Sequence, residues 1–229
     1  MDDQLGSIFI PPHITAGSAF AFGPHKEIVT CAHVLVAALS LPQGTNIFYA
    51  SELSVKRLHL KYALPKFDLA VLSPDSEILG EPFAIGDFNK MRPGDQIVYI
   101  GYDQKASVSN QDISIIHAAT VTATGAAMND GRIINFIEFQ GEGLPGYSGG
   151  PVFNYKGELV AVIREAWTKK GVKGGPEVLI NRAFSLDILQ TLDGEVFSEN
   201  PKNAADTNKV TTLIDVIGSS DIREKSAGP

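Results

Sequence analysis

Cysteine is nearly absent from this sequence, which has one, Cys31, among 229 residues. A single cysteine excludes an internal disulfide, and chains without disulfides are typical of reducing compartments. No window approaches the run of about 18 apolar residues that a membrane-spanning helix needs. The first 17 residues have neither a basic stretch nor a long apolar run, so they do not resemble a signal peptide. These absences predict a cytoplasmic protein with no membrane partner.

Positive charge is also scarce, because the formal net charge is −7 at pH 7 and no stretch holds five or more basic residues in a row. Binding to a nucleic-acid backbone needs such a basic surface, so we expect no nucleic-acid partner. His13, His25 and His59 lie at no metal-ligand spacing from one another or from Cys31. We therefore expect no metal and no cofactor.

The apolar residues occur in short runs rich in β-branched and aromatic side chains, such as EIVTCAHVLVA (27–37), DQIVYIGYD (95–103) and RIINFIEFQ (132–140). Turn residues rich in Gly, Pro, Asn and Asp separate these runs, as in RPGD (92–95). Short alternating runs between turns are typical of an all-β sandwich or barrel. Helix signals are weak, and the clearest is FSLDILQTLDG (184–194), which a glycine ends.

The domain organisation follows from the same composition. Residues 1–194 are predicted to form one domain of two β halves, with the boundary near 75–90. Residues 195–229 are polar and are predicted to be an appendage, partly disordered. The apolar stretch VTTLIDVI (210–217) within it reads best as a segment that docks on its own domain, with a partner site as the alternative.

Three stretches carry the residue types of nucleophilic catalysis. IVTCAHVL places His33 at the end of an apolar strand, KFDLAVL places Asp68 at the head of another, and LPGYSGGPVF carries Ser148. A serine hydroxyl needs a base to take its proton, and the base needs a carboxylate to fix its tautomer. A developing oxyanion needs two converging backbone N–H groups, which Gly146 and Ser148 could supply. Asp75 and Asp87 are the fallback acids.

In this order, TCAHV, FDLAVL and GYSGGPVF resemble the three catalytic blocks of the chymotrypsin/trypsin-like serine peptidases. They are most similar to the short bacterial HtrA/Deg-like branch, here without room for a PDZ domain, over about residues 15–190. The resemblance implies two six-stranded antiparallel β-barrels with the active site in the cleft between them. It implies a serine endopeptidase acting on protein or peptide substrates through an acyl-enzyme. His33 would be the general base, Asp68 its orienting acid and Ser148 the nucleophile, with the amides of Gly146 and Ser148 as the oxyanion hole.

Tyr147 departs from the digestive members of this family, which have an aspartate that pairs with a new N-terminus after cleavage. A tyrosine cannot form that ion pair, so the oxyanion loop, residues 141–147, must be controlled in another way. One alternative stays open: a binding or regulatory module that is silent until a partner protein orders this loop.

The substrate pocket is predicted by resemblance to be lined by Glu142, Leu144, Pro145, Ile163, Arg164 and Ala166. An inward Glu142 would favour Lys or Arg in the substrate, and a Glu142 facing solvent would favour small aliphatic residues; the second is the preferred prediction. Arg164 would either lie beside Asp68 or extend into the substrate groove. His117 is read as a strand residue, with a pocket role as the alternative, and Cys31 as a small buried apolar residue.

Overall fold

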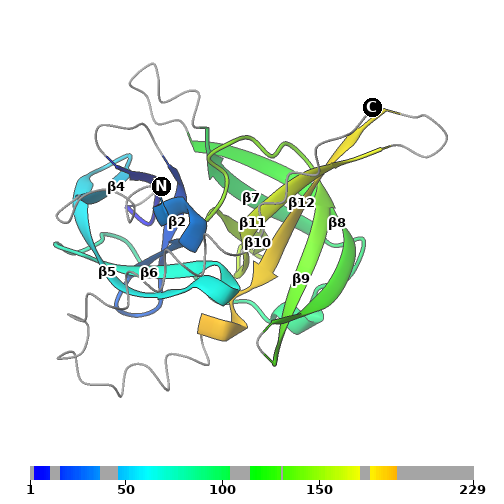
Figure 1. Cartoon of the computed structure of the whole chain (residues 1–229), viewed down its shortest axis with the longest axis horizontal. Helices are drawn as coiled ribbons and strands as arrows, with labels where there is room; N and C mark the ends of the chain where they lie inside the picture. Colours follow the sequence, from blue (N-terminus) through cyan, green and yellow to red (C-terminus); the bar gives the residue numbers. More distant parts are fainter. Residues whose placement is uncertain are drawn as a thin grey trace.

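The structure is a computed structural model that describes residues 3–10, 16–36, 46–103, 114–129, 131–170 and 176–189. Its first six strands close into a barrel in the order β1-β2-β3-β6-β5-β4, shown in blue and cyan in Figure 1. They are β1 (Leu5–Phe9), β2 (Gly17–Phe22), β3 (Glu27–Cys31), β4 (Ile47–Ser51), β5 (Val55–Leu64) and β6 (Leu69–Pro74).

A second closed barrel follows in the order β10-β11-β12-β9-β8-β7, shown from green to orange in Figure 1. Its strands are β7 (Gln96–Tyr102), β8 (Ser114–Asn129), β9 (Arg132–Gln140), β10 (Pro151–Asn154), β11 (Leu159–Lys169) and β12 (Val178–Ser185). Every strand pair in both barrels is antiparallel. The predicted fold class, two six-stranded antiparallel barrels, is confirmed.

Alternation of side chains explains how these runs become barrel strands. In β9, Ile137 and Phe139 are fully buried while Glu138 between them is half-buried on the other face. Closing each sheet on itself leaves no unpaired edge strand in the barrel. The turns rich in Gly and Asp that separate the runs lie between the strands.

The apolar core is continuous across the two barrels. One cluster of buried side chains fills the first barrel and extends to Phe153 and Phe184 of the second, and another fills the second barrel around Tyr99 and Phe139. Burial of apolar surface contributes roughly 25 cal/mol per Å². Because one apolar cluster includes side chains of both barrels, the two barrels pack directly against each other, and groups from both can meet.

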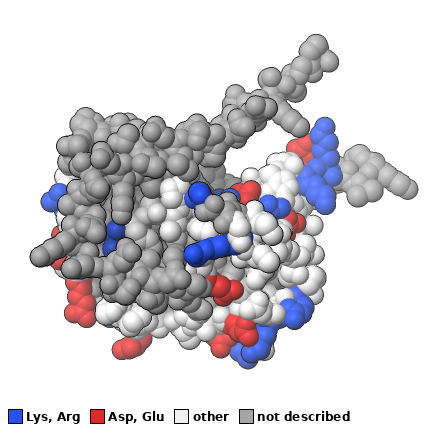
Figure 2. Space-filling view, turned by 60° about the horizontal axis from the view of Figure 1, so that its bottom comes forward, with Lys and Arg blue, Asp and Glu red and all other residues white. Residues whose placement is uncertain are grey.

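The chain passes between the barrels from residue 75 to 95, a segment that contains the 3-10 turn η3 (Phe88–Lys90). After β12 a helical turn covers residues 187–189. The predicted appendage, 195–229, and its apolar stretch 210–217 lie outside the described residues. No helix in the described part of the chain is long and apolar enough to cross a membrane. On the face shown in Figure 2, acidic and basic side chains of the described residues are interspersed.

At the start of β5 a buried ion pair reverses the usual placement of charged side chains outside and apolar side chains inside. Lys56 is 8% exposed although the neighbouring Val55 is 68% exposed. The reason is Asp3, which is fully buried and lies 3.2 Å from the Lys56 ammonium. The hydroxyls of Ser51 and Ser54 donate to the same carboxylate. Burial alone would raise the pKa of Asp3, but these hydroxyls and Lys56 outweigh burial, so its pKa lies below the ordinary value.

We expect Asp3→Asn to lower the free energy of unfolding at pH 7 by about 3 kcal/mol, since Lys56 is left buried without a counter-charge. A carboxyl whose folded-state pKa is lowered stabilises the fold fully above its unfolded pKa of about 3.9, and this contribution is lost as the pH falls through the lower folded value. Urea unfolding at pH 7 and pH 3 should therefore show a smaller gap between wild type and variant at pH 3. Asp75→Asn, at an exposed carboxylate, is the control, and an equal gap at both pH values would contradict the assignment.

Candidate active site

His33 and Asp68 lie at neighbouring strand ends of the first barrel. His33 is in the 3-10 turn η1 (Ala32–Leu35) that follows β3, and Asp68 stands just before β6. Strands β3 and β6 are paired, with Cys31 opposite Leu69, and the amide of Ala32 donates to the Asp68 carbonyl at 3.0 Å. Strand pairing thus brings together two residues that are 35 positions apart in the chain.

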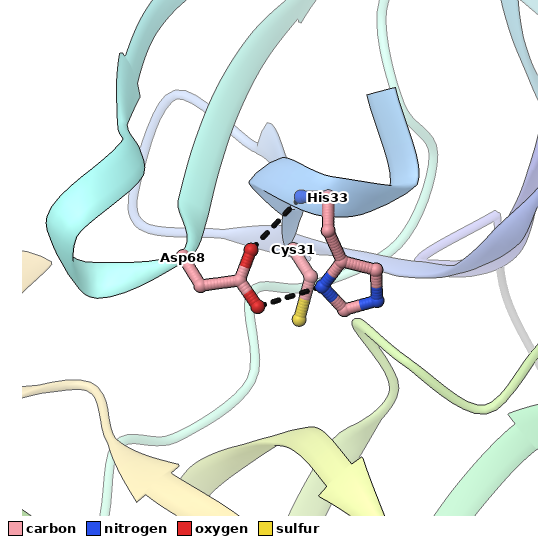
Figure 3. Close-up of side chains that lie close together, drawn as sticks. All are labelled: Cys31, His33 and Asp68. Atoms are coloured by element: carbon pink, nitrogen blue, oxygen red, sulfur yellow. Dashed lines mark hydrogen bonds and ion pairs between the residues drawn. The ribbon is translucent and has the colours of Figure 1, made fainter. Parts of the chain in front are cut away.

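The Asp68 carboxylate contacts His33 through both of its oxygens (Figure 3). Oδ1 accepts the His33 backbone N–H at 2.8 Å, and Oδ2 lies 2.7 Å from the ring Nδ1. The side chain of His33 is 43% exposed and that of Asp68 is 17% exposed. A proton held on Nδ1 by the carboxylate leaves Nε2, which points away from Asp68, with a free lone pair. This is the tautomer that a general base requires.

The backbone at Asp68 is left-handed, with φ of 51°. Aspartate and asparagine tolerate this conformation better than most residues because their short polar side chains can bond locally. Here the same geometry turns the carboxylate back toward the turn that carries His33.

Arg164 of β11 lies beside Asp68, which was one of the two placements left open by the sequence. Its Nε is 3.6 Å from Asp68 Oδ2, and its guanidinium stacks 4.3 Å from the centre of the Phe184 ring. The two fallback acids, Asp75 and Asp87, have other partners, and Asp75 accepts the Ser76 hydroxyl at 3.3 Å. Asp87 accepts the Asn89 amide at 3.0 Å and pairs with Lys90 at 3.2 Å.

Cys31 stands beneath this pair, and its Sγ, a His33 ring nitrogen and an Asp68 oxygen lie within 4.8 Å of one another (Figure 3). Such a trio could be read as a set of metal ligands. However, Nδ1 already faces Asp68, and the thiol donates to the Ile163 carbonyl at 3.3 Å. Burial, with a smaller contribution from Asp68, raises the pKa of Cys31 well above its usual range, which disfavours the thiolate that binds metals. The residues present fit a hydrogen-bonded pair better than a metal site.

Ser148 lies three residues before β10, and the two residues that follow it are hydrogen-bonded to β11. The Gly149 amide donates to the Ile163 carbonyl at 2.8 Å, and the Ile163 amide donates to the Gly150 carbonyl at 2.8 Å. Because the Cys31 thiol also donates to Ile163, one carbonyl joins the serine segment to the strand that leads to His33. Within the described residues, the Ser148 hydroxyl donates to the Arg164 carbonyl at 3.5 Å and forms no hydrogen bond with His33.

The sequence LPGY forms a tight turn directly before Ser148. The Tyr147 amide donates to the Leu144 carbonyl at 3.1 Å, and Gly146 has φ of 108°. Proline at the second position and a positive φ at the third define a type II turn. In this turn the peptide plane between Pro145 and Gly146 is rotated by about 180° relative to a type I turn. The Pro–Gly pair therefore sets the direction in which the Gly146 amide faces.

Ser18 of β2, which the sequence gave no reason to single out, joins this turn to the first barrel. It is buried, its amide donates to the Ser148 carbonyl at 2.8 Å, and its hydroxyl donates to the Gly146 carbonyl at 2.7 Å. The same hydroxyl accepts the Tyr102 amide at 2.8 Å. Both residues expected to form the oxyanion hole are thus held by one serine from the other barrel.

The residues predicted to line the pocket have different environments. Glu142, Pro145 and Ala166 are exposed, and Leu144 packs against the core of the second barrel. The side chain of Ile163 is 2% exposed and lies in that core, so it does not line an open pocket. Glu142 thus faces solvent, which is the placement that the sequence linked to small aliphatic substrate residues.

Asn181 of β12 is a further residue that the sequence did not identify. It is fully buried, and its Nδ2 donates to the Gly141 carbonyl at 3.2 Å and to the Glu142 carbonyl at 3.5 Å. Its Oδ1 has no hydrogen-bond partner among the described residues. The only available signal was an amide inside the apolar run EVLINRAFS, and a buried amide is expected to bind backbone groups.

A protein-family model described as a trypsin-like peptidase domain matches residues 17–162. Among curated proteins, a probable periplasmic serine endoprotease DegP-like from Marinomonas sp. (strain MWYL1) is 31% identical over 186 residues, which is 79% of this chain and 36% of that protein. A protein of the same description from Bartonella henselae is 29% identical over 183 residues, covering 78% of this chain and 33% of the relative. The chain therefore spans about a third of the length of these relatives.

Solved structures show the same fold. An HtrA-type protease, AlgW with a decapeptide, superposes with a TM-score of 0.64 and 19% identity over 86% of this chain and 64% of that chain. The MamO protease domain from Magnetospirillum magneticum gives a TM-score of 0.59 and 14% identity over 83% of this chain and 96% of that chain. The resemblance drawn from the three sequence blocks is confirmed by these matches.

The predicted cytoplasmic location is contradicted by the same comparison, because the similar curated proteins are named periplasmic. The step from a single cysteine to a reducing compartment failed. A chain with one cysteine has no internal disulfide in any compartment, so its cysteine count does not indicate where it is located. A barrel pair with an apolar core this extensive does not depend on disulfides for stability.

Proposed function

Because this chain belongs to the family of trypsin-like peptidases, we propose that it is a serine endopeptidase that cleaves protein or peptide substrates. The observation that carries the proposal is the two-point contact of Asp68 with His33, next to a serine segment held by bonds to both barrels. The names of the relatives support the same activity and a periplasmic location.

In the proposed mechanism, His33 Nε2 takes the proton of Ser148 as Oγ attacks the substrate carbonyl carbon. The imidazolium that forms is stabilised by Asp68, and the amides of Gly146 and Ser148 bind the oxyanion. His33 then gives its proton to the leaving amine, and the C–N bond breaks to leave an acyl-enzyme. Water, activated by the same base, hydrolyses the ester and restores Ser148.

The Ser148 hydroxyl must leave the Arg164 carbonyl for this mechanism to operate. The bond is 3.5 Å long, and so weak a hydrogen bond is readily exchanged. Nucleophile–base hydrogen bonds are often loose in free enzymes and tighten when substrate binds. Rotation about the Cα–Cβ bond of Ser148 on substrate binding is therefore part of the proposal.

The exposure of Glu142 bears on substrate preference. Because this carboxylate faces solvent, it does not supply a buried negative charge for Lys or Arg. We infer a preference for small aliphatic side chains next to the scissile bond, accommodated between residues 142–145 and Ala166.

A second candidate function is supported by the orientation of Ser148 toward Arg164 rather than His33. It is a regulatory module in which a partner protein must reorient the serine before catalysis. The partner would bind near the oxyanion loop, either at the substrate's position or beside the bound substrate.

The test is labelling of the purified protein with a fluorophosphonate, followed by peptide mapping. Fluorophosphonates phosphonylate an activated serine and need no knowledge of the substrate. We expect one modified residue, Ser148, without addition of any partner. A folded protein that reacts only after a partner is added would favour the regulatory module, and modification of a different serine would overturn the proposed nucleophile.

A further inference from the structure

The oxyanion loop, residues 141–147, is tied to its own barrel near both ends. Near its beginning, the Tyr99 hydroxyl donates to the Glu142 carbonyl at 3.0 Å and the Asn181 amide donates to the Gly141 carbonyl at 3.2 Å. At its end, the Tyr147 hydroxyl lies 2.7 Å from His117 Nε2. These ties come from β7, β12 and β8, so three strands of the second barrel hold one loop.

Of these contacts, the one made by Tyr147 lies nearest in the chain to Ser148, the proposed nucleophile. The Tyr147 backbone stands between Gly146 and Ser148, the two residues whose amides would bind the oxyanion. Its side chain is 2% exposed and lies flat against β7 at Gly101, where a Cβ would overlap the tyrosine ring. With its ring packed against Gly101, Tyr147 places its phenol oxygen 2.7 Å from His117 Nε2.

The His117 ring is itself held in place. It stacks on Tyr99, with ring centres 4.9 Å apart and planes inclined by 18°, and Tyr99 is the residue that binds Glu142. The two ties therefore share one aromatic cluster, Tyr99–His117–Tyr147, whose rings lie within 6.4 Å of one another.

We propose that His117 is a positioning residue for peptide hydrolysis: through the Tyr147 hydroxyl it fixes the peptide planes that present the Gly146 and Ser148 amides to the oxyanion. The inference rests on the proposed function. It adds a hydrogen bond within the second barrel to the Ser18 contacts that hold Gly146 and Ser148 from the first barrel.

Burial, with smaller contributions from Tyr99 and Glu142, raises the pKa of Tyr147 to about 12. The phenol therefore keeps its proton throughout the neutral range, and the contact with His117 does not depend on an ion pair. Misplacing a reacting group by about 1 Å can lower a rate by roughly 100-fold, so loss of this one bond has a measurable effect on catalysis.

The experiment compares Tyr147→Phe, His117→Leu, His117→Gln and the double variant Tyr147→Phe/His117→Leu. Fluorophosphonate is the probe, with its maximal rate of inactivation and its half-saturating concentration measured separately. We expect Tyr147→Phe and His117→Leu each to lower the maximal rate by about 10- to 100-fold and to leave half-saturation within about twofold. The glutamine variant should recover most of the rate, because its amide can reach the phenol.

The double variant should be no slower than the slower single variant, since both remove the same bond. His59→Leu, the same substitution at an exposed position of β5, is the matched control and should react like wild type. If His117→Leu does not fold, Tyr147→Phe removes only one oxygen atom and still tests the bond.

The inference would be overturned if the single variants kept the wild-type maximal rate, or if the losses of the two single variants added up in the double variant. It would also be overturned if His117→Gln were as slow as His117→Leu. A wild-type protein whose Ser148 does not react would instead overturn the proposed function.

Discussion

Ser148→Ala is expected to lower kcat for peptide hydrolysis by about four to six orders of magnitude and to abolish fluorophosphonate labelling. Alanine has no hydroxyl to donate to His33 and to attack the substrate carbonyl, so no acyl-enzyme can form. Any remaining hydrolysis would come from water attacking a substrate held in the site. Stopped assays with a fluorescently labelled unfolded protein, run beside the labelling reaction, measure both effects.

The same substitution should leave the fold intact. Among the residues that the structure describes, the Ser148 hydroxyl forms one long hydrogen bond, 3.5 Å to the Arg164 carbonyl. Its loss should therefore change the free energy of unfolding by less than about 1 kcal/mol. Ser76→Ala, at an exposed serine in the segment between the two barrels, is the control for activity. Substantial activity in the Ser148 variant would show that another residue is the nucleophile.

Asp68→Asn is expected to lower kcat by about 10⁴-fold. The His33 backbone amide, 2.8 Å from Oδ1, requires an oxygen on that side of the side chain. The asparagine NH2 then faces Nδ1, which must become the acceptor, so the proton moves to Nε2. A histidine protonated on Nε2 cannot take the proton of Ser148.

Asparagine suits this test because it tolerates the left-handed backbone of residue 68, whereas alanine would add strain. The rate of fluorophosphonate labelling and kcat for peptide hydrolysis should fall together, with Asp75→Asn as the matched control on an exposed carboxylate. A loss of less than about tenfold would mean that another group orients His33.

Much of the candidate site could be predicted because its residues stand in local patterns. TCAHV, FDLAVL and GYSGGPVF each combine a strand with a turn and one reactive residue, and their order restricted the choice to one family. The all-β fold followed equally from short apolar runs between turn residues. The type II turn before Ser148 was encoded by the adjacent Pro145 and Gly146.

The supporting residues could not be predicted, because no local pattern marks them. Ser18 lies 128 positions from Gly146, whose carbonyl it binds, and His117 lies 30 positions from Tyr147. Each is a single polar residue in an apolar run, and the side chain that it meets depends on the register of strands far apart in the chain. The placement of Ile163 in the core had the same cause.

The sequence by itself determined the all-β class, the three blocks that carry His33, Asp68 and Ser148, and the turn at Gly146, because these depend on neighbours in the chain. Only the tertiary structure decided that Arg164 lies beside Asp68, that Ser18 joins the two barrels, and that His117 holds Tyr147. Those contacts arise when two sheets close and pack together, and closure is a property of strand register and side-chain volume across the whole domain.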